Sequence, residues 1–445
     1  MSSTQARIGC GAGFAADRIE PAVDLVDRGG LDVIALECLG ERTVSLAALR
    51  KLSDPRGGYD PMLRKRMSAL LEPLNRTGTR LVTNAGAADP VEAARMVRAL
   101  GAELGVPTTA AAVTGDDVLD RVDLSAPAWE DGAPLESHGE IVSANAYIGA
   151  DALLPALRGP APVVIAGRAA DPSLFLAPLA HLLDWEADDW ERMAAGTLVG
   201  HLLECAGQVT GGYFADPGRK PVPGLARLGY PIAEVGRQGG AVITKPPGTG
   251  GRVDRMTVAE QLTYEVTDPR AYLTPDVSLD ISAVEVSDHG GDRVAVRGAR
   301  GRNRPQELKV SVGYRAGFRG EGEISYAGRG ALDRARLAAE IVRERLGDAL
   351  PRLRADVVGH SALHGEALAE GAQPYECRLR VAGLAGSQAA AEAVGEEVSA
   401  LYTSGPAGGG GLRVGTTEVV GVLSTTVPRE RVETGVVVFE GNAAE

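Results

Sequence analysis

This chain of 445 residues lacks a cluster of positive charge, closely spaced cysteine pairs and long apolar runs. The formal net charge is −13, and no patch of lysine and arginine stands out that would neutralise phosphates, so we expect no nucleic-acid partner. No apolar run approaches the roughly 20 residues of a membrane-spanning helix, and the start, MSSTQARIG, lacks an apolar signal-peptide core. These absences predict a cytoplasmic protein with no membrane partner.

Several catalytic signatures are absent as well. The four cysteines lie far apart without a CxxC pair, which argues against a disulfide framework or a zinc knuckle. The sequence has no G-x-S-x-G in a strand-to-helix setting, no HExxH and no Walker A motif, so classical serine hydrolase, zincin and kinase chemistries are excluded. Aromatic residues are few and glycines number 58, which is typical of a protein that works through backbone loops.

Strand-like and helix-like segments alternate through the first half of the chain. This rhythm predicts an α/β fold with an open, mostly parallel sheet and helices on both faces. The second half has more polar, alternating strands and two strand–glycine–helix units, which predict a smaller α+β domain. We place the two domains at residues 1–275 and 276–445. The expected strands include 7–11, 31–37, 79–86 and 108–117, and the expected helices include 19–29, 62–78, 89–105, 331–347 and 387–402.

The stretch RIGCGAGFAADR, residues 7–18, resembles a dinucleotide-binding turn only in part. That fingerprint is G-x-G-x-x-G, whereas this chain reads G-x-G-x-G and has Phe14 where the third glycine belongs. Glu37, at the end of the second expected strand, is where a ribose-binding acid would stand. The alternatives are a tight turn, or a loop whose Asp17 and Arg18 line a pocket at the carboxyl edge of the sheet.

Polar residues beside glycines follow several of the expected strands. Ligands of doubly wound folds bind beyond the carboxyl ends of the strands, so these loops predict one composite site. Asn84 would hold a carbonyl or carboxylate oxygen, and the planar fork of Arg168 would clamp a carboxylate or phosphate. Asp89 and Asp171 each precede proline, and helix capping is the alternative reading for both.

Later segments add further candidates. In residues 200–218, GHLLECAGQVTGGYFADPG, we expect a helix that runs into the glycines after Thr210, with His201 and Cys205 on one face and Glu204 and Gln208 on another. Lys245 and the glycines of TKPPGTGG would contact a phosphate, although the P-loop order is missing. His360 and His364 have metal-like spacing only if their segment is helical, and Gly359 argues against a helix.

These positions form two sets, and we predict no metal ligand and no cofactor apart from a CoA moiety as part of the substrate. The catalytic set is Asp17, Glu37, Glu41, Asn84, Arg168, Asp171 and Glu204; the substrate-binding set is Gly11, Gly13, Arg18, Arg42, Asn145, Tyr147, Gln208, Gly211, Lys245 and Gly250.

Long, ordered phrases of the sequence carry a resemblance to a known family. RIGCGAGFAADRIEPAVDL, ECLGERT, VSANAYIGAD, VIAGRAADPSLFLAPL, GHLLECAGQVTGGYFADPG and GPAGGGG resemble the acyclic terpene utilisation family, AtuA, over nearly the whole chain. The resemblance implies a role in the catabolism of acyclic terpenoids, which proceeds through acyl-CoA esters. It assigns no catalytic residue.

The resemblance and the strand-end residues together predict a lyase-type enzyme, a hydratase, dehydratase or carbon–carbon lyase, acting on a branched-chain or terpenoid-derived acid or its acyl-CoA ester. The expected partners are that small molecule and further copies of the chain. In this reading Glu37 or Asp17 is the base, Arg168 and Asn84 hold the substrate, and Lys245 contacts a phosphate. Two alternatives stay open: a non-catalytic subunit of an acyl-CoA enzyme, and an NAD(P)-dependent oxidoreductase.

Overall fold

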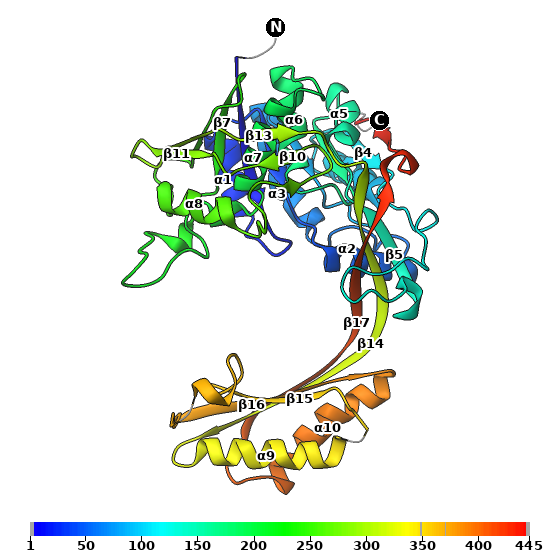
Figure 1. Ribbon diagram of the computed structural model, residues 1–445, viewed down its shortest axis with the longest axis vertical. Helices are drawn as coiled ribbons and strands as arrows, with labels where there is room; N and C mark the ends of the chain where they lie inside the picture. Colours follow the sequence, from blue (N-terminus) through cyan, green and yellow to red (C-terminus); the bar gives the residue numbers. More distant parts are fainter. Residues whose placement is uncertain (1–3, 348, 370, 442–445) are drawn as a thin grey trace. The chain divides into compact units, whose positions relative to one another are not determined.

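The computed structural model describes residues 4–347, 349–369 and 371–441, which form two compact units (Figure 1). The first unit contains the residues up to 135, 142–313 and those from 422 on; the second contains 136–141 and 314–421. Along the chain, the second unit is therefore inserted into the first. The boundary expected between residues 275 and 276 falls inside the first unit, between β9 (Tyr272–Leu273) and β10 (Ser278–Asp280).

A ten-stranded sheet forms the centre of the first unit, and it confirms the predicted α/β class. The order is β11-β12-β8-β7-β1-β2-β3-β6-β4-β18, and the run from β1 to β4 is parallel. Antiparallel strands extend the sheet at both edges, which the alternating pattern of the first half did not indicate. The strands are β1 (Gln5–Ala12), β2 (Val33–Leu36), β3 (Arg80–Thr83), β4 (Ala110–Thr114), β6 (Val163–Ala166), β7 (Ile232–Gly236), β8 (Ala241–Thr244), β11 (Glu285–Asp288), β12 (Val294–Arg297) and β18 (Gly435–Phe439).

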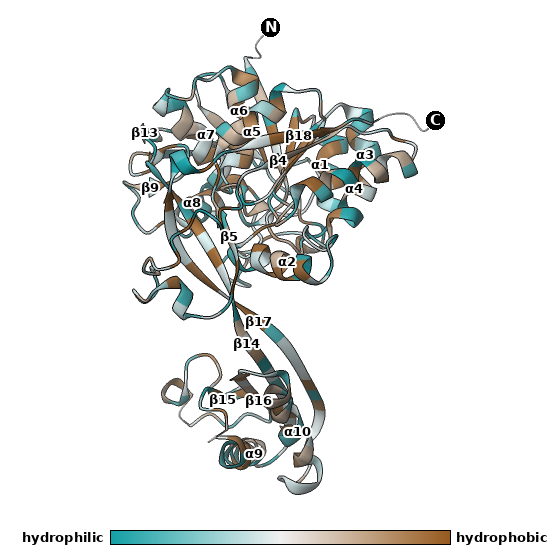
Figure 2. Cartoon of the chain, turned by 90° about the vertical axis from the view of Figure 1, so that its right-hand side faces the viewer, coloured by the Kyte–Doolittle hydropathy of each residue, from teal (hydrophilic) through white to brown (hydrophobic). Residues whose placement is uncertain are grey.

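Helices cover both faces of this sheet, as predicted. In Figure 2, where β4 and β18 face the viewer, one group of helices lies to the right of the strands and another to the left. The central strands are apolar along their whole length and buried, as strands covered on both faces must be. The right-hand group is α1 (Glu20–Arg28), α3 (Leu63–Thr77) and α4 (Pro90–Glu103); the left-hand group is α5 (Ala150–Arg158), α6 (Ser173–Leu183) and α7 (Trp190–Leu203).

The Asp-Pro sequences at Asp89 and Asp171 behave differently. Asp89 caps α4, because its side chain accepts a hydrogen bond from the Glu92 amide at 3.0 Å. Asp171 precedes α6, but the residue at the cap position is Pro172 and no side chain caps the helix. The Asp171 carboxylate instead pairs with Arg168, so capping accounts for the first aspartate and not for the second.

The helix expected to carry both His201 and Gln208 ends earlier than the sequence suggested. α7 stops at Leu203, Glu204 is its cap, and a short 3-10 turn, η2 (Ala206–Gln208), follows. Ala206 adopts a φ of 42°, which breaks the helical path. His201 and Cys205 therefore do not share one helix face, and that prediction is wrong.

Smaller elements complete the first unit. Within residues 4–347, 349–369 and 371–441, no helix has both the length and the apolar content for crossing a bilayer. The remaining elements are α2 (Glu41–Ser53), α8 (Arg255–Thr263), β5 (Ile141–Ala146), which pairs with β14, and a three-stranded sheet of β13 (Arg300–Arg302), β10 and β9.

The second unit has a β-α-β-β-α-β chain order. Its strands are arranged β15-β16-β14-β17, and α9 and α10 pack against β16 and against each other over a separate apolar core. The strands β14 and β17 also continue into the first unit. The elements are β14 (Glu307–Ala327), α9 (Ala331–Leu346), β15 (Leu353–Val358), β16 (Glu376–Ala385), α10 (Gln388–Ser404) and β17 (Gly410–Pro428).

Candidate active site

The residues that follow the central parallel strands meet at the carboxyl edge of the sheet. Glu37 follows β2, and Asn84 follows β3. The Asn84 amide nitrogen donates to Glu37 Oε1 at 3.0 Å, and its oxygen accepts from the Cys38 amide at 2.7 Å. Both Glu37 and Asn84 are buried, so the amide of Asn84 ties two adjacent strand ends together.

Arg168 follows β6 and is 1% exposed. Its Nε and Nη2 donate to the Ala169 carbonyl at 3.0 and 2.6 Å, Nη1 donates to the Leu39 carbonyl, and Nη2 also pairs with Asp171. Its guanidinium lies over the Tyr147 ring, 4.5 Å from the ring centre. Arg168 is thus an internal clamp on two loops and on Asp171, rather than the open carboxylate fork that the sequence suggested.

Glu37 and Asp171 form a pair of interacting carboxyl groups. Burial, then repulsion from Asp171, raises the pKa of Glu37 to about 8, although Arg168 and the bond from Asn84 act in the opposite direction. Burial also raises the pKa of Asp171, against the attraction of Arg168. The Asp171 side chain is 36% exposed, so this pair has contact with solvent from one side. A protonated Glu37 beside an arginine-bound carboxylate is a proton donor next to a proton acceptor.

A second titratable pair lies where α7 ends. His201 Nδ1 and Glu204 Oε1 are 3.1 Å apart, and His201 Nε2 lies 3.1 Å from the Leu262 carbonyl. That carbonyl can only accept, so Nε2 carries a hydrogen and the second proton is shared between Nδ1 and Glu204. Burial raises the pKa of Glu204 to about 7; burial lowers the pKa of His201, but its bond to Glu204 outweighs this and raises it.

The two pairs interact with one another. Asp171 is one of the charges that raise the pKa of Glu204, and Glu204 and Asp171 both raise the pKa of Tyr272 after burial. The Tyr272 ring lies 5.3 Å from the His201 ring. We call Glu37, Asp171, Glu204 and His201 together the carboxyl cluster.

Next to Arg168, Tyr147 and Lys309 surround Glu41 and stabilise its charged form. The Tyr147 hydroxyl donates to Glu41 Oε1 at 2.6 Å, and Lys309 Nζ lies 3.2 Å from the same oxygen. Burial acts to raise the pKa of Glu41, but the bond from Tyr147 and the charges of Lys309 and Arg168 lower it to about 2. Glu41 is therefore a fixed anion, and the strong burial of Tyr147 beside it raises the pKa of the phenol.

Asn145 is linked to Arg168 through Asp116. Its amide nitrogen donates to Asp116 Oδ2 at 2.9 Å, and the Arg168 amide donates to the same oxygen at 2.8 Å. Among the described residues, Asn145 Oδ1 and Glu204 Oε2 are buried oxygens without a hydrogen-bond partner. Buried polar atoms in proteins nearly always find a partner, so each of these oxygens can accept a bond from water or a ligand.

The opening glycine loop packs against protein instead of leaving room for a dinucleotide. A Cβ on Gly13 would lie 2.6 Å from the Ala206 nitrogen and closer still to the backbone of Glu204 and Cys205. The Gly13 amide donates to Asp17 Oδ2 at 2.8 Å. Because α1 starts only at Glu20, no helix N-terminus directly follows β1, as the dinucleotide fold would need. Gly13 thus brings the loop of Asp17 into backbone contact with Glu204.

The remaining predicted positions are not members of the carboxyl cluster. Gly11 is inside β1, where a Cβ would meet Ile34, Leu36 and Ala22. Arg42 is exposed on α2, Gln208 bonds the hydroxyl of Tyr264, and Gly211 has a φ of 103°. Lys245 is buried and its ammonium lies 3.0 Å from both the Thr249 carbonyl and Asp292, so it braces the glycine loop from inside. Arg18 and Gly250 line a separate cavity.

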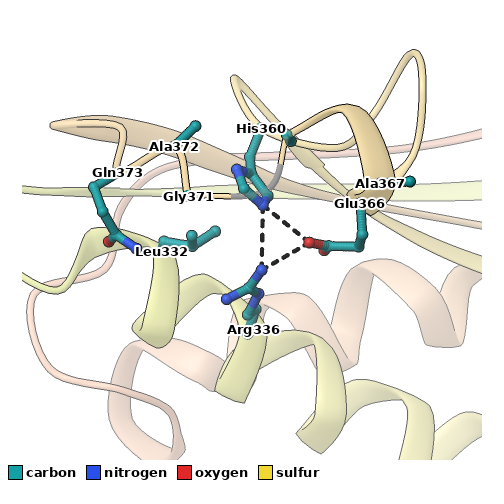
Figure 3. Close-up of a pocket in the computed structure, with 9 residues that line it drawn as sticks. Leu332, Arg336, His360, Glu366, Ala367, Gly371, Ala372 and Gln373 are labelled. Carbon is teal, nitrogen blue, oxygen red and sulfur yellow. Dashed lines mark hydrogen bonds and ion pairs between the residues drawn. The ribbon is translucent and has the colours of Figure 1, made fainter.

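The histidine pair of the second unit has no metal-binding geometry. His360 and His364 lie in a turn, not a helix, and Figure 3 shows His360 pointing towards Arg336 and Glu366. His360 Nε2 is 2.9 Å from Glu366 and 3.2 Å from Arg336. Within residues 4–347, 349–369 and 371–441, no group of three or more His, Cys, Asp or Glu side chains is arranged to hold a metal ion.

The sequence reasoning left some contributors out of the two sets. His201 was noticed but not assigned, although its i, i+3 spacing to Glu204 on a helix end was a usable signal. Asp116 likewise stands at the end of an expected strand and was noticed but not assigned. Tyr272 and Lys309 reach the site only through the fold, because each lies on a strand far away in the sequence.

Comparison with known proteins identifies one family. The family model described as acyclic terpene utilisation family protein AtuA matches residues 6–438. No significant match to a curated protein or to a solved structure was found.

Proposed function

The chain belongs to the acyclic terpene utilisation family AtuA, and from the carboxyl cluster we propose that it is an acid–base enzyme of lyase type. Its substrate in this proposal is a branched-chain or terpenoid-derived acid or the acyl-CoA ester of one. The reaction is the addition or removal of water next to the carbonyl. One observation carries the proposal: Glu37, with a pKa of about 8, lies beside Asp171, whose carboxylate is paired with Arg168.

Hydration needs two proton transfers, and the cluster has one group for each. Asp171 takes a proton from water while the water oxygen bonds to the β-carbon of an α,β-unsaturated substrate. Glu37 gives its proton to the α-carbon, so one water is added across the double bond and the charges balance. Both hydrogen bonds that Glu37 receives, from Leu39 and Asn84, go to Oε1, which leaves Oε2 to carry the proton. Dehydration is the reverse of these steps.

His201 and Glu204 supply a second proton reservoir in the same proposal. They share one proton across 3.1 Å, and the pKa of Glu204, about 7, lies close to neutral pH. Carbon–carbon cleavage next to a carbonyl would use the same groups, with the base acting on a β-hydroxyl instead of on water.

The test measures turnover of CoA thioesters and free forms of branched α,β-unsaturated acids, by loss of the conjugated chromophore and a mass gain of one water. Glu37→Gln keeps the bond from Asn84 to Oε1 but removes the acid, and we expect kcat/KM to fall about 100-fold or more. In the wild type, kcat/KM should decrease above about pH 8 as Glu37 loses its proton.

Asp276→Asn is the matched control. Asp276 is also buried with a raised pKa, about 6, but it bonds Ser173 and the Ala150 amide outside the carboxyl cluster. Its variant should keep wild-type turnover if it folds. Unchanged turnover in both Glu37→Gln and Asp171→Asn would reject the acid–base assignment.

A further inference from the structure

A second site lies in the first unit, in a cavity of about 870 Å³ that the carboxyl cluster does not use. One wall is the face of α1 that carries Glu20, Asp24 and Arg28. The others are two glycine loops, one at Gly224 and one at Gly248–Gly250. The volume is within the range of pockets that hold drug-sized ligands, and far more than one carboxylate needs.

Three arginines line this cavity. Arg18 Nη1 has only long hydrogen bonds, 3.3 Å to the Ala226 carbonyl and 3.5 Å to the Leu225 carbonyl. Arg28 bonds the Pro247 carbonyl and lies 3.7 Å from Asp24, which is a weak ion pair. Arg227 is exposed, and its guanidinium has no hydrogen bond or ion pair with any residue that the structure describes. Donors are therefore available on at least two guanidinium groups.

The glycine loops bring backbone close to the same space. A Cβ on Gly250 would collide with the Gly224 carbonyl, so the two loops touch backbone to backbone. Lys245, buried beneath, bonds the Thr249 carbonyl and holds the loop in place. The Thr249, Gly250 and Gly251 amides donate to carbonyls of neighbouring segments, so they are not available to a ligand and the loop forms a fixed wall of the cavity.

The acidic residues of the cavity narrow the choice of ligand. The cavity is lined by three arginines and by the carboxylates of Glu20 and Asp24, so its lining carries both signs of charge and suits more than a simple anion. Guanidinium groups suit phosphate oxygens, and carboxylates accept hydrogen bonds from hydroxyl and amino groups. A nucleotide presents both kinds of group in one molecule.

We propose that this cavity, between α1 and the loops at Gly224 and Gly248–Gly250, binds the phosphates of a nucleotide, either free or as the nucleotide end of a CoA ester. Arg18, Arg28 and Arg227 contact the phosphates in this assignment, and Glu20 or Asp24 accepts from the sugar or the base. The proposal is independent of the acid–base proposal, because it uses none of the residues of the carboxyl cluster. The two sites share one segment, since Arg18 follows Asp17, whose loop touches Glu204 at Gly13.

Calorimetric titration of the full chain with coenzyme A, pantetheine, ADP and inorganic phosphate tests the proposal. We expect coenzyme A to bind and pantetheine, which lacks the nucleotide, not to bind. Arg227→Ala should weaken coenzyme A binding about tenfold or more, because charge-assisted hydrogen bonds are lost from a side chain that has no other partner. Arg18→Ala should act in the same direction.

The control is Arg64→Ala, which removes an exposed arginine of α3 that pairs with Glu103 at a distance from the cavity. It should leave the affinity unchanged. Arg227→Ala removes no hydrogen bond or ion pair of the described chain, so loss of binding in this variant is not expected to come from a folding defect. Circular dichroism and the thermal midpoint check this directly.

Comparing the ligands also shows whether the cavity binds a free nucleotide or the nucleotide end of a CoA ester. Binding of ADP as tight as that of coenzyme A, with the same dependence on Arg227, supports a free nucleotide; tighter binding of coenzyme A supports the ester. No binding of either, or binding that Arg227→Ala and Arg18→Ala leave unchanged, overturns the proposal, as does inorganic phosphate binding as tightly as both. Turnover by the carboxyl cluster without nucleotide binding would overturn this proposal alone, and nucleotide binding without turnover would overturn only the acid–base proposal.

Discussion

Glu37 and Glu41 are four residues apart in the sequence and have opposite chemistry. The pKa of Glu37 is about 8 because the side chain is buried next to Asp171. The pKa of Glu41 is about 2 because Tyr147 and Lys309 contact its carboxylate, and this outweighs partial burial. One glutamate therefore carries a proton at neutral pH and the other a charge, and only their neighbours in space make the difference.

This contrast predicts opposite effects on stability. The folded pKa of Glu37 lies above its unfolded value near 4.5, so its contribution is fully present below about pH 4.5 and is lost as the pH rises through about 8. In Glu37→Gln that loss is absent. Relative to the variant, the wild type should lose free energy of unfolding between pH 5 and 9, on the order of 3 kcal/mol. Urea unfolding at several pH values measures it.

Glu41→Gln is the companion variant with the reverse sign. The folded pKa of Glu41 lies below its unfolded value, so its stabilising contribution is present above about pH 4.5 and is lost as the pH falls through about 2. The variant should be less stable than the wild type at pH 7, and the difference should shrink in acid. A Glu37→Gln protein that gained nothing over the wild type at pH 9 would contradict the assignment of a protonated Glu37.

The ends of secondary-structure elements, more than their middles, position the site. Glu37, Asn84 and Arg168 follow strands, Glu204 ends α7, and Glu41 begins α2. The carbonyl that fixes the tautomer of His201 belongs to Leu262, in the last turn of α8. Fraying at the end of α7, the start of α2 or the end of α8 would therefore displace Glu204, Glu41 or the Leu262 carbonyl.

α8 offers a test of this dependence. The Asp254 side chain accepts hydrogen bonds from the amides of Met256 and Thr257 at 2.8 and 3.0 Å, and Thr257 Oγ1 accepts from the Asp254 amide at 3.2 Å. Asp254→Ala should lower the free energy of unfolding by about 1–2 kcal/mol. Asp254→Asn, which can still accept both bonds, should lose clearly less. Equal losses in the two variants would show that the ion pair with Arg252, not the cap, stabilises this end.

At the scale of the whole molecule, the second unit is an insertion. The chain leaves the first unit along β14 and returns along β17, and these two strands are neighbours in one sheet. Each unit has an apolar core of its own. Every residue of the carboxyl cluster and of the arginine cavity belongs to the first unit.

This organisation predicts that the first unit folds without the second. The test variant replaces residues 314–421 by a two-residue Asn-Gly turn. This turn joins the remaining parts of β14 and β17, which are neighbours in the sheet, as a hairpin. We expect cooperative thermal unfolding and unchanged coenzyme A binding, measured by circular dichroism and calorimetry. A variant that is molten or insoluble would show that β14 and β17 need the second unit in order to pair.

The sequence by itself determined the central strands, most of the helices and the edge of the sheet where polar residues gather. Apolar runs of four residues, Asp-Pro starts and glycine stops are local signals, and local signals are what a single sequence contains. It also showed the family, through long phrases in a fixed order.

Only the tertiary structure decided what those polar residues do. The sequence suggested that the Arg168 guanidinium binds a substrate, but in the structure it donates hydrogen bonds to Leu39, Ala169 and Asp171. The antiparallel edge strands and the inserted second unit likewise depend on pairings between distant segments. The pKa of a carboxyl group depends on burial and on charges a few ångströms away, and these come from residues as far apart in the chain as Glu37 and Asp171.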